Sequence, residues 1–311
     1  MNILVQLPLS DAQKARLEAA APGSRFTYAK PREVTAALVR EADAIVGNVA
    51  PGLLEGADRL RLLQLNSAGY DKYVAPGTVP AGAALCSASG AYGQAVSEHV
   101  FASVLALMKK LPGYRDLQRG REWGDLGTVC SPAGAHVLVL GAGDIGTHLA
   151  RLFSAVGAHV TGVRSRASEP AAPFEHMGTL ADLPGLLPQA DVVAAVLPST
   201  PATRGVADEA FFAAMRPGSY FANAGRGDLV DQAALVSALE SGHLAGAALD
   251  VTSPEPLPRD SPLWSAPNCL VTPHISGFFH LPVTLDNIVG IAAENLAALA
   301  AGEPLRNRVD L

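Results

Sequence analysis

Three residues in the last third of the chain, Arg226, Glu255 and His274, have side chains whose types suit proton transfer and the binding of a carboxylate. An arginine can hold a carboxylate and polarise a carbonyl through its planar fork. A histidine titrates near neutral pH, so it can give a proton to the carbonyl oxygen or take one back. A nearby carboxylate would orient that histidine and stabilise its protonated ring. The elements that position these three residues decide whether they can act together.

Each of the three residues lies in a loop that follows a predicted strand. Arg226 comes just after the strand 219–223, and His274 just after the strand 269–272, whereas Glu255 lies in a proline-rich loop after a third strand. In open parallel sheets, ligands bind outside the carboxyl ends of the strands. Taken alone, each residue has an ordinary structural explanation, such as a surface ion pair or a solvated loop acid. Their common position favours the catalytic interpretation.

A glycine turn upstream has the pattern G-x-G-x-x-G and joins the apolar run His136–Leu140 to a helix-type segment. Gly141 allows the tight turn, Gly143 lets the backbone approach a pyrophosphate, and Gly146 lets helix and strand pack closely. The N–H groups at the helix start would face the phosphates. A second apolar run follows at 159–163. This context predicts a dinucleotide-binding unit rather than a glycine-rich turn of another α/β protein.

The residues after the second strand of this unit indicate which dinucleotide is bound. An acid at this place accepts hydrogen bonds from the 2′-OH of NAD, whereas an arginine accommodates the 2′-phosphate of NADP. Here the strand is followed by Arg164, Ser165 and Arg166, and the first acid is Glu169. The alternative is a solvated basic turn. We expect NADP(H) to be preferred and NAD(H) to be possible.

Short strands and helices alternate along the chain, which predicts parallel sheets wrapped by helices. We expect an α/β protein of two doubly wound parallel-sheet domains, with a Rossmann NAD(P)-binding domain inserted into a flavodoxin-like substrate domain. The substrate domain would comprise 1–98 plus 283–311, and the dinucleotide domain 99–282. The predicted strands are 3–7, 25–28, 44–46, 62–65, 83–86, 136–140, 159–163, 191–197, 219–223, 245–249 and 269–272.

Helices are predicted between these strands. A long one should span 95–111 and end at Pro112-Gly113, with a helix and loop over 114–135. The last, at 283–301, should return to cover the first domain, because the second already has its own helices. The others are predicted at 11–20, 32–41, 147–156, 208–214 and 231–241.

Composition excludes several other classes of protein. The 311 residues carry a formal net charge of −6 with no block of Lys and Arg, so we expect no nucleic-acid partner. The three cysteines form no C-x-x-C pair, and the histidines form no ligand-like cluster, so we expect no metal. No G-x-S-x-G elbow is present. The chain opens on a strand-type run and contains no apolar stretch long enough to span a bilayer, so we expect no signal peptide, no membrane partner and a cytoplasmic location.

Several longer stretches make the chain similar to one family, the D-isomer-specific 2-hydroxyacid dehydrogenases. The matching motifs are 141–146, 197–203 (LPSTPAT), 215–231 (MRPGSYFANAGRGDLVD), 246–258 (GAALDVTSPEPLP) and 272–277 (TPHISG), with weaker matches at 67–71 and 95–98. The resemblance covers essentially the whole chain.

The resemblance implies a role for each matching residue. Arg226 would clamp the substrate, His274 would be the acid/base and Glu255 its partner. Asp250 would contact the nicotinamide amide. The backbone of Ser67, Ala68 and Gly69 would bind the substrate carboxylate in a cleft between the domains. The cofactor would be bound by Gly141, Gly143, Asp144, Ile145, Gly146, Arg164, Ser165, Arg166, Leu197, Pro198, Thr203, Ala224, Gly225, Asp250, His274 and Gly277.

These observations predict an NADP(H)-preferring oxidoreductase that acts on a small 2-keto or D-2-hydroxy acid such as glyoxylate or hydroxypyruvate. The resemblance alone implies that it is a homodimer. Formate dehydrogenases of the superfamily carry Gln where Glu255 stands, which argues against formate. One alternative is an NAD-linked D-lactate or phosphoglycerate-type dehydrogenase of the same family. Another is a dinucleotide-sensing scaffold or corepressor on the same fold. The aromatic pair Phe278 and Phe279 indicates either an apolar pocket or simple core packing.

Overall fold

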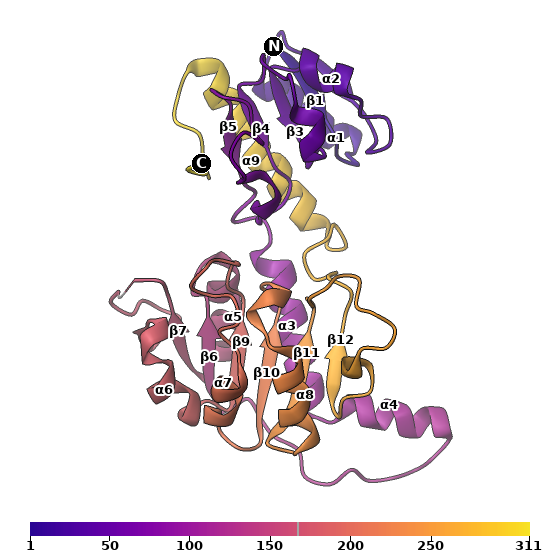
Figure 1. The fold of residues 1–311 in the computed structure, drawn as a ribbon, viewed down its shortest axis with the longest axis vertical. Helices are drawn as coiled ribbons and strands as arrows, with labels where there is room; N and C mark the ends of the chain where they lie inside the picture. Colours follow the sequence, from indigo (N-terminus) through magenta and orange to yellow (C-terminus); the bar gives the residue numbers. More distant parts are fainter. Residues whose placement is uncertain (167) are drawn as a thin grey trace. The chain divides into compact units, whose positions relative to one another are not determined.

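The computed structural model describes residues 1–166 and 168–311 and divides into two units (Figure 1). The first unit comprises Met1–Tyr92 with Leu281–Leu311, and the second comprises Gly93–His280. The expected boundaries at 98/99 and 282/283 fall inside two helices, α3 (Gly93–Met108) and α9 (Pro282–Ala301). Each helix packs as a whole on one unit, so the chain changes units before the helix begins.

The first unit is built on a five-stranded sheet with the order β2-β1-β3-β4-β5. All neighbours are parallel. The strands are β1 (Asn2–Val5), β2 (Arg25–Tyr28), β3 (Ala44–Val46), β4 (Leu62–Gln64) and β5 (Ala84–Cys86). The remaining elements are α1 (Asp11–Ala20), α2 (Ala36–Glu41), η1 (Pro51–Leu54), η2 (Asp71–Tyr73) and α9.

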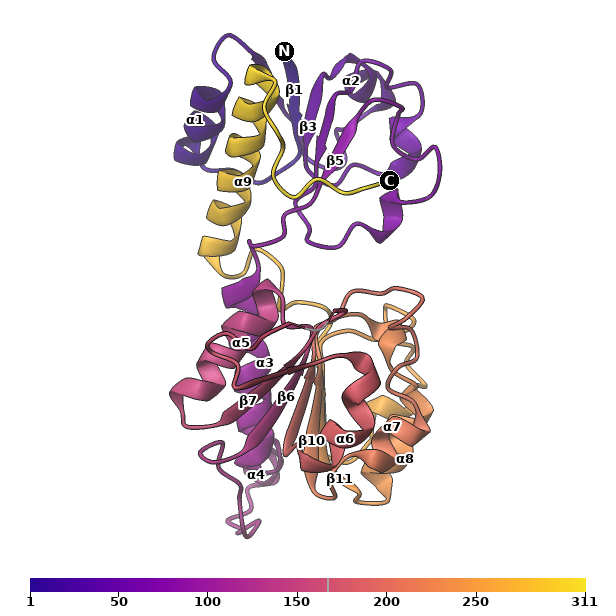
Figure 2. The same cartoon turned by 90° about the vertical axis from the view of Figure 1, so that its left-hand side faces the viewer.

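Successive side chains of these strands point to opposite faces, so the sheet is buried on both sides. Ile3 and Val5 pack in one cluster with residues of α1 and α9. Leu4 packs on the other face with Val39 of α2. Figure 2 shows α1 and α9 side by side next to this sheet. The helix predicted to return from the end of the chain therefore completes the first core.

The returning helix corrects one expectation from the sequence. By length and hydropathy α9 could cross a bilayer, although no stretch was expected to be long enough. In the structure 61% of its most apolar 18-residue segment is buried. Ile288, Val289 and Leu296 are completely buried. Its hydropathy is accounted for by packing in the core of the first unit.

The second unit has seven parallel strands in the order β12-β11-β10-β9-β6-β7-β8. The order reverses between β6 and β9, which is the switch point where doubly wound sheets bind ligands. The strands are β6 (His136–Leu140), β7 (His159–Val163), β8 (His176–Gly178), β9 (Val192–Ala195), β10 (Ser219–Asn223), β11 (Leu244–Leu249) and β12 (Cys269–Val271).

Helices cover both faces of this sheet, with α3 and α5 on one side and α6, α7 and α8 on the other (Figure 2). Phe101 of α3 meets Phe153 of α5 edge to face at 5.1 Å. Phe211, Phe212 and Phe221 pack together on the opposite face. The elements are α5 (Asp144–Ala155), η3 (Leu180–Asp182), α6 (Leu183–Leu186), η4 (Leu187–Gln189), α7 (Glu209–Ala214), η5 (Gly227–Leu229), α8 (Gln232–Glu240) and η6 (Pro262–Trp264).

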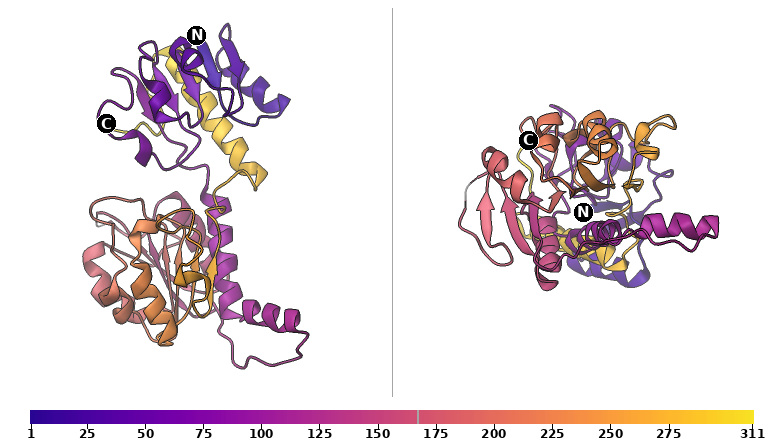
Figure 3. Two further views of the ribbon diagram at one scale, coloured as in Figure 1. Left: turned by 45° about the vertical axis from the view of Figure 1, so that its right-hand side comes forward. Right: turned by 90° about the horizontal axis from the view of Figure 1, so that it is seen from below.

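The end of the long helix differs from the sequence prediction. Helix α3 ends at Met108, and Lys110 adopts a left-handed conformation with φ 55°. The next helix, α4 (Leu111–Gly120), then contains Pro112-Gly113 in its first turn. Proline is tolerated there because the first N–H groups of a helix have no intrahelical partner. Figure 3 shows α4 extending away from the sheet of the second unit.

Candidate active site

The three glycines of the nucleotide turn have the backbone environments that their proposed roles require. Gly141 has φ 108°, and a Cβ on it would lie 3.0 Å from the backbone of Val196. A Cβ on Gly146 would lie 2.1 Å from the carbonyl oxygen of Gly141, so any side chain would separate the turn from α5. Around Gly143 there is open space. Gly141 and Gly146 are therefore packed against backbone, whereas Gly143 leaves the turn open to a ligand.

The start of α5 lies directly behind this open glycine. Gly143 is the N-cap, and no side chain caps the helix start. Helix α5 begins at Asp144 rather than at the predicted residue 147, so Asp144 and Ile145 both belong to its first turn. The N-terminus of a helix attracts anions through its N–H groups and its dipole. The geometry therefore fits the pyrophosphate of a dinucleotide.

Arg164 is held against the same turn. Its Nε donates a hydrogen bond of 2.8 Å to the carbonyl oxygen of Ala142, the residue between the first two glycines. This bond uses Nε and leaves the Nη groups as donors for an anion. Arg164, Ser165 and Arg166 are all exposed. A guanidinium fixed in this way presents its Nη groups to an anion beside the nucleotide turn.

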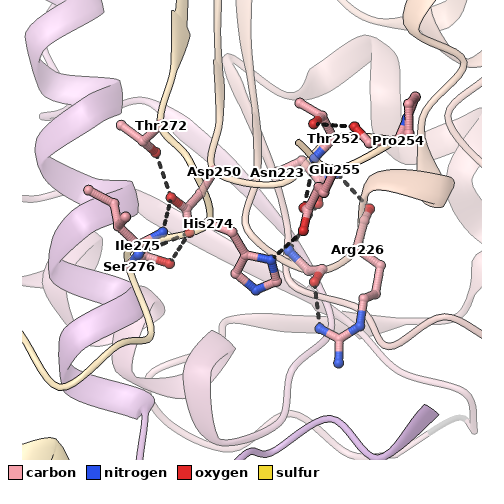
Figure 4. Close-up of polar contacts among 11 residues, drawn as sticks. Asn223, Arg226, Asp250, Thr252, Pro254, Glu255, Thr272, His274, Ile275 and Ser276 are labelled. Atoms are coloured by element: carbon pink, nitrogen blue, oxygen red, sulfur yellow. Dashed lines mark hydrogen bonds and ion pairs between the residues drawn. The ribbon is translucent and has the colours of Figure 1, made fainter. Parts of the chain in front are cut away.

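The two catalytic candidates with acid–base side chains form a direct pair. His274 Nδ1 lies 2.9 Å from Glu255 Oε2 (Figure 4). The other oxygen of Glu255 accepts a hydrogen bond of 3.1 Å from the backbone N–H of Thr252. The carboxylate is thus fixed at both oxygens, and it orients the imidazole through Nδ1. Nε2 is the ring nitrogen that this pairing leaves for a substrate.

His274 lies on a strained turn. Its φ is 53°, a left-handed conformation that only a few per cent of non-glycine residues adopt, with asparagine, aspartate and histidine the most frequent among them. The backbone N–H of His274 donates a 2.7 Å hydrogen bond to the carbonyl oxygen of Asp250. The turn directs the imidazole toward Glu255, as Figure 4 shows.

Asp250 holds the residues on both sides of this turn. Its Oδ1 accepts hydrogen bonds from the Thr272 hydroxyl at 2.6 Å and from the Ile275 N–H at 3.0 Å. Its Oδ2 accepts from the N–H and the hydroxyl of Ser276. Burial disfavours the charged form of Asp250, but these hydrogen bonds outweigh it and lower the pKa of the carboxyl. Its expected contact with a nicotinamide amide stays a prediction.

Arg226 is positioned by the end of β10. The side chain of Asn223 donates to the carbonyl oxygen of Arg226 at 2.8 Å and accepts from the N–H of Gly225 at 3.0 Å. Arg226 Nη1 donates to the carbonyl oxygen of Gly225 at 2.8 Å. Figure 4 shows the guanidinium on the same side of the loops as the His274 ring. The second unit therefore gathers Arg226, Glu255 and His274 at the carboxyl ends of its strands.

The other expected cofactor residues belong to loops at the same end of the sheet. Gly225 packs closely on Leu197, because a Cβ on Gly225 would lie 2.5 Å from the carbonyl oxygen of Leu197. Thr203 is buried, and its hydroxyl donates to the carbonyl oxygen of Pro198 at 2.7 Å. The hydrogen bond therefore stabilises the loop 198–203. Ala224 and Gly277 follow β10 and the His274 turn.

The loop Ser67, Ala68 and Gly69 follows β4 in the first unit. Asn48 Nδ2 donates to Ser67 Oγ at 3.0 Å, and Ser67 Oγ donates to the carbonyl oxygen of Gly69. Asn48 and Asn66 also exchange hydrogen bonds between side chain and backbone. The loop is thus held in one shape by its neighbours.

Sequence reasoning did not single out the residues that position this site. Asn223 bonds to the backbone of Arg226, Thr252 donates its N–H to Glu255, and Ser276 donates to Asp250. These hydrogen bonds depend on how the loops fold against one another. All three lie inside the motifs that carry the family resemblance, and that is the signal that could have found them. Within residues 1–166 and 168–311, no group of three His, Cys, Asp or Glu side chains is arranged to hold a metal ion.

Comparison with known proteins identifies relatives over the whole chain. The family model described as the NAD-binding domain of D-isomer-specific 2-hydroxyacid dehydrogenases matches residues 101–276. The chain is similar to glyoxylate/hydroxypyruvate reductase A of Serratia proteamaculans, with 30% identity over 100% of this chain and 99% of that protein.

Solved structures agree with this similarity. A D-isomer-specific 2-hydroxyacid dehydrogenase family protein from Aeromonas salmonicida superposes with a TM-score of 0.88 at 32% identity, covering 99% of this chain and 98% of that one. The D-isomer-specific 2-hydroxyacid dehydrogenase from Xanthobacter autotrophicus, solved in complex with NADPH and MES, gives 0.82 at 31% identity with the same coverage.

Proposed function

The chain belongs to the D-isomer-specific 2-hydroxyacid dehydrogenase family, and we propose that it reduces glyoxylate or hydroxypyruvate with NADPH as the preferred cofactor. The proposal depends above all on the His274–Glu255 pair, which lies at the same end of the sheet as the glycine turn. Oxidation of the corresponding 2-hydroxy acid is the reverse reaction.

The residues of the second unit fit a bound dinucleotide. The uncapped start of α5 and the open space at Gly143 would hold the pyrophosphate. When bound, the reduced nicotinamide would supply the hydride that the carbonyl carbon receives. The chain itself would contribute the groups that bind and polarise the keto acid.

Arg226 and His274 would divide the work on the substrate. The guanidinium of Arg226 would hold the carboxylate and polarise the carbonyl. His274 would donate a proton from Nε2 to the carbonyl oxygen, while Glu255 at Nδ1 stabilises the imidazolium before the transfer. The fixed Ser67–Gly69 backbone would bind the carboxylate from the first unit.

Arg164 supports the preference for NADP(H). Its hydrogen bond to Ala142 fixes a positive charge beside the nucleotide turn, and two further polar residues follow it. The Xanthobacter relative binds NADPH in its crystal structure. Steady-state rates with NADPH and NADH, each at saturating glyoxylate, test this preference. A lower KM and higher kcat/KM for NADH would contradict it and favour an NAD-linked enzyme.

The substrate class is tested with a panel of 2-keto acids assayed with NADPH. Glyoxylate and hydroxypyruvate should give the highest kcat/KM, and pyruvate and phosphohydroxypyruvate lower values. If NADPH binds but no 2-keto acid is reduced, the proposal fails and a dinucleotide-sensing role is favoured.

The homodimer and the cytoplasmic location also stay predictions. Leu111 and Val129 are large exposed apolar residues on α4 and the loop after it, and Trp123 between them is fully exposed. Large apolar side chains left exposed along one segment are what a subunit interface would cover. Size-exclusion chromatography with light scattering should therefore give twice the mass of 32.0 kDa.

A further inference from the structure

His99 contacts the residues that hold the catalytic turn. It lies on α3, and its side chain is only 25% exposed. His99 Nε2 lies 3.1 Å from the hydroxyl oxygen of Thr272 and 3.9 Å from Asp250 Oδ1. Nothing in the sequence connects this histidine with the site, because it is 173 residues from Thr272 along the chain.

The direction of the hydrogen bond follows from the single proton of a hydroxyl. Thr272 Oγ1 lies 2.6 Å from Asp250 Oδ1, and the ionised carboxylate can only accept. Thr272 therefore gives its proton to Asp250 and must accept from His99. His99 carries a proton on Nε2, and the hydrogen bonds run in one direction from His99 through Thr272 to Asp250.

The same carboxylate fixes the backbone on which the catalytic histidine lies. Asp250 accepts hydrogen bonds from the N–H groups of Ile275 and Ser276, and its carbonyl oxygen accepts from the N–H of His274. Three consecutive N–H groups are thereby held by one residue. This supports the left-handed conformation of His274, which otherwise costs free energy.

We propose that His99 is a positioning residue that acts through Thr272 and Asp250 to hold the His274 turn in its productive conformation. By donating to Thr272, His99 fixes the hydroxyl in the orientation that serves Asp250. Asp250 then keeps both of its oxygens aligned with the 274–276 backbone. The catalytic effect of His99 rests on the proposed reductase function, whereas its effect on the turn does not.

Two substitutions separate the donated hydrogen bond from the bulk of the side chain. In His99→Gln the amide nitrogen can replace Nε2 as donor to Thr272. In His99→Leu a side chain of similar size has no donor. We expect His99→Leu to lower kcat for glyoxylate about tenfold, the rate factor that corresponds to one hydrogen bond, with little change in KM. His99→Gln should recover kcat to within about twofold.

Amide hydrogen exchange gives a readout that is independent of turnover. In the full-length protein without substrate, the amides of Ile275 and Ser276 should exchange about tenfold faster in His99→Leu than in wild type. His99→Gln should match wild type. Equal amide exchange in all three proteins would overturn the proposal. An equal fall in kcat, or an equal rise in exchange, in both variants would also overturn it, since a hydrogen-bond donor at position 99 would then not matter.

The two measurements distinguish this proposal from the proposed function. If wild type reduces no 2-keto acid but the exchange difference is found, the positioning role stands and the function fails. If wild type is active and the Leu variant has normal kcat and normal exchange, the function stands and the positioning role fails.

Discussion

Gly227 packs against the backbone of Thr252 so closely that a Cβ on Gly227 would lie 1.9 Å from the Thr252 carbonyl oxygen. Gly227 follows Arg226, and Thr252 donates its N–H to Glu255. The loop that carries Arg226 and the loop that carries Glu255 are therefore in direct contact through their backbones. This contact fixes the spacing between Arg226, the proposed substrate clamp, and the proposed acid–base pair of Glu255 and His274.

The first prediction is that Gly227→Ala lowers both stability and activity. The added methyl must push the two loops apart, because backbone rather than a flexible side chain occupies its place. We expect a loss of about 1–3 kcal/mol in the free energy of unfolding, as for overpacking elsewhere, and a fall in kcat/KM of at least about tenfold. Urea unfolding and steady-state kinetics measure the two effects.

The matched control is Gly185→Ala in α6 of the same unit, where a Cβ would meet nothing within 4 Å. It should leave kcat/KM unchanged and should not lower the free energy of unfolding, because alanine favours a helix over glycine. Wild-type kinetics in Gly227→Ala would show that the loops can separate without affecting the site.

The second prediction concerns His274 as the acid. Asparagine tolerates the left-handed conformation that His274 adopts with φ 53°, so His274→Asn removes the imidazole with little backbone strain. We expect kcat to fall by about a hundred- to ten-thousandfold, with NADPH affinity and melting temperature little changed. His274→Ala should lose activity similarly and also about 1 kcal/mol of stability, from strain at positive φ. Near-full activity in His274→Asn would remove this residue from the mechanism.

Much of the fold was predictable because its strands are short apolar runs between polar segments. The structure confirms the two-domain parallel fold, and β2, β3 and β10 have the predicted bounds. The strand β8 and the helix α6 were missed. β8 has only three residues, of sequence His-Met-Gly, and α6 contains Pro and Gly. Local sequence disfavours both, so they depend on packing against the rest of the unit.

The candidate site likewise contains residues that the sequence identified and residues that it did not. Arg226, Glu255 and His274 were identifiable from residue type and position after strands, and the structure places them together. Asn223 was identifiable only as part of a family motif and His99 not at all, because a common polar side chain acquires its role only when another element approaches it. Sequence periodicity contains no information on which loop α3 meets at His99.

The third prediction tests the glycine turn with a pair of substitutions. Gly143→Ala adds a methyl in open space, and the φ of −90° suits an alanine, so the variant should unfold like wild type. Its NADPH affinity should fall at least about tenfold, because the methyl occupies the approach to the pyrophosphate. Gly146→Ala should instead lower the melting temperature, since its Cβ would lie 2.1 Å from the Gly141 carbonyl oxygen. Thermal unfolding and fluorescence titration with NADPH distinguish the two. Unchanged NADPH affinity in Gly143→Ala would mean that the pyrophosphate does not bind at this glycine.

The fourth prediction tests the cofactor preference. Arg164→Ala removes a guanidinium that is fixed to the Ala142 carbonyl. We expect the KM for NADPH to rise about tenfold or more while the KM for NADH changes less than about twofold, because only NADPH has the 2′-phosphate. Arg151→Ala, at an exposed position on α5, is the control for loss of a positive charge. An equal rise in KM for both cofactors would mean that Arg164 stabilises the turn and does not bind the 2′-phosphate.

The last prediction uses the buried carboxylate of Asp250, whose pKa is lowered in the folded protein. A group with a lowered folded pKa stabilises the protein above its unfolded pKa, about 3.9, and this stabilisation is lost as the pH falls through the folded value. Asp250→Asn should cost about 2 kcal/mol at pH 7, because an amide cannot accept all four hydrogen bonds. The difference from wild type in urea unfolding should be constant between pH 7 and about pH 5 and should shrink below about pH 4. The exposed Asp260→Asn serves as the control and should show no such difference. A difference for Asp250→Asn that stays constant down to about pH 3 would mean that the charge of Asp250 does not hold the turn.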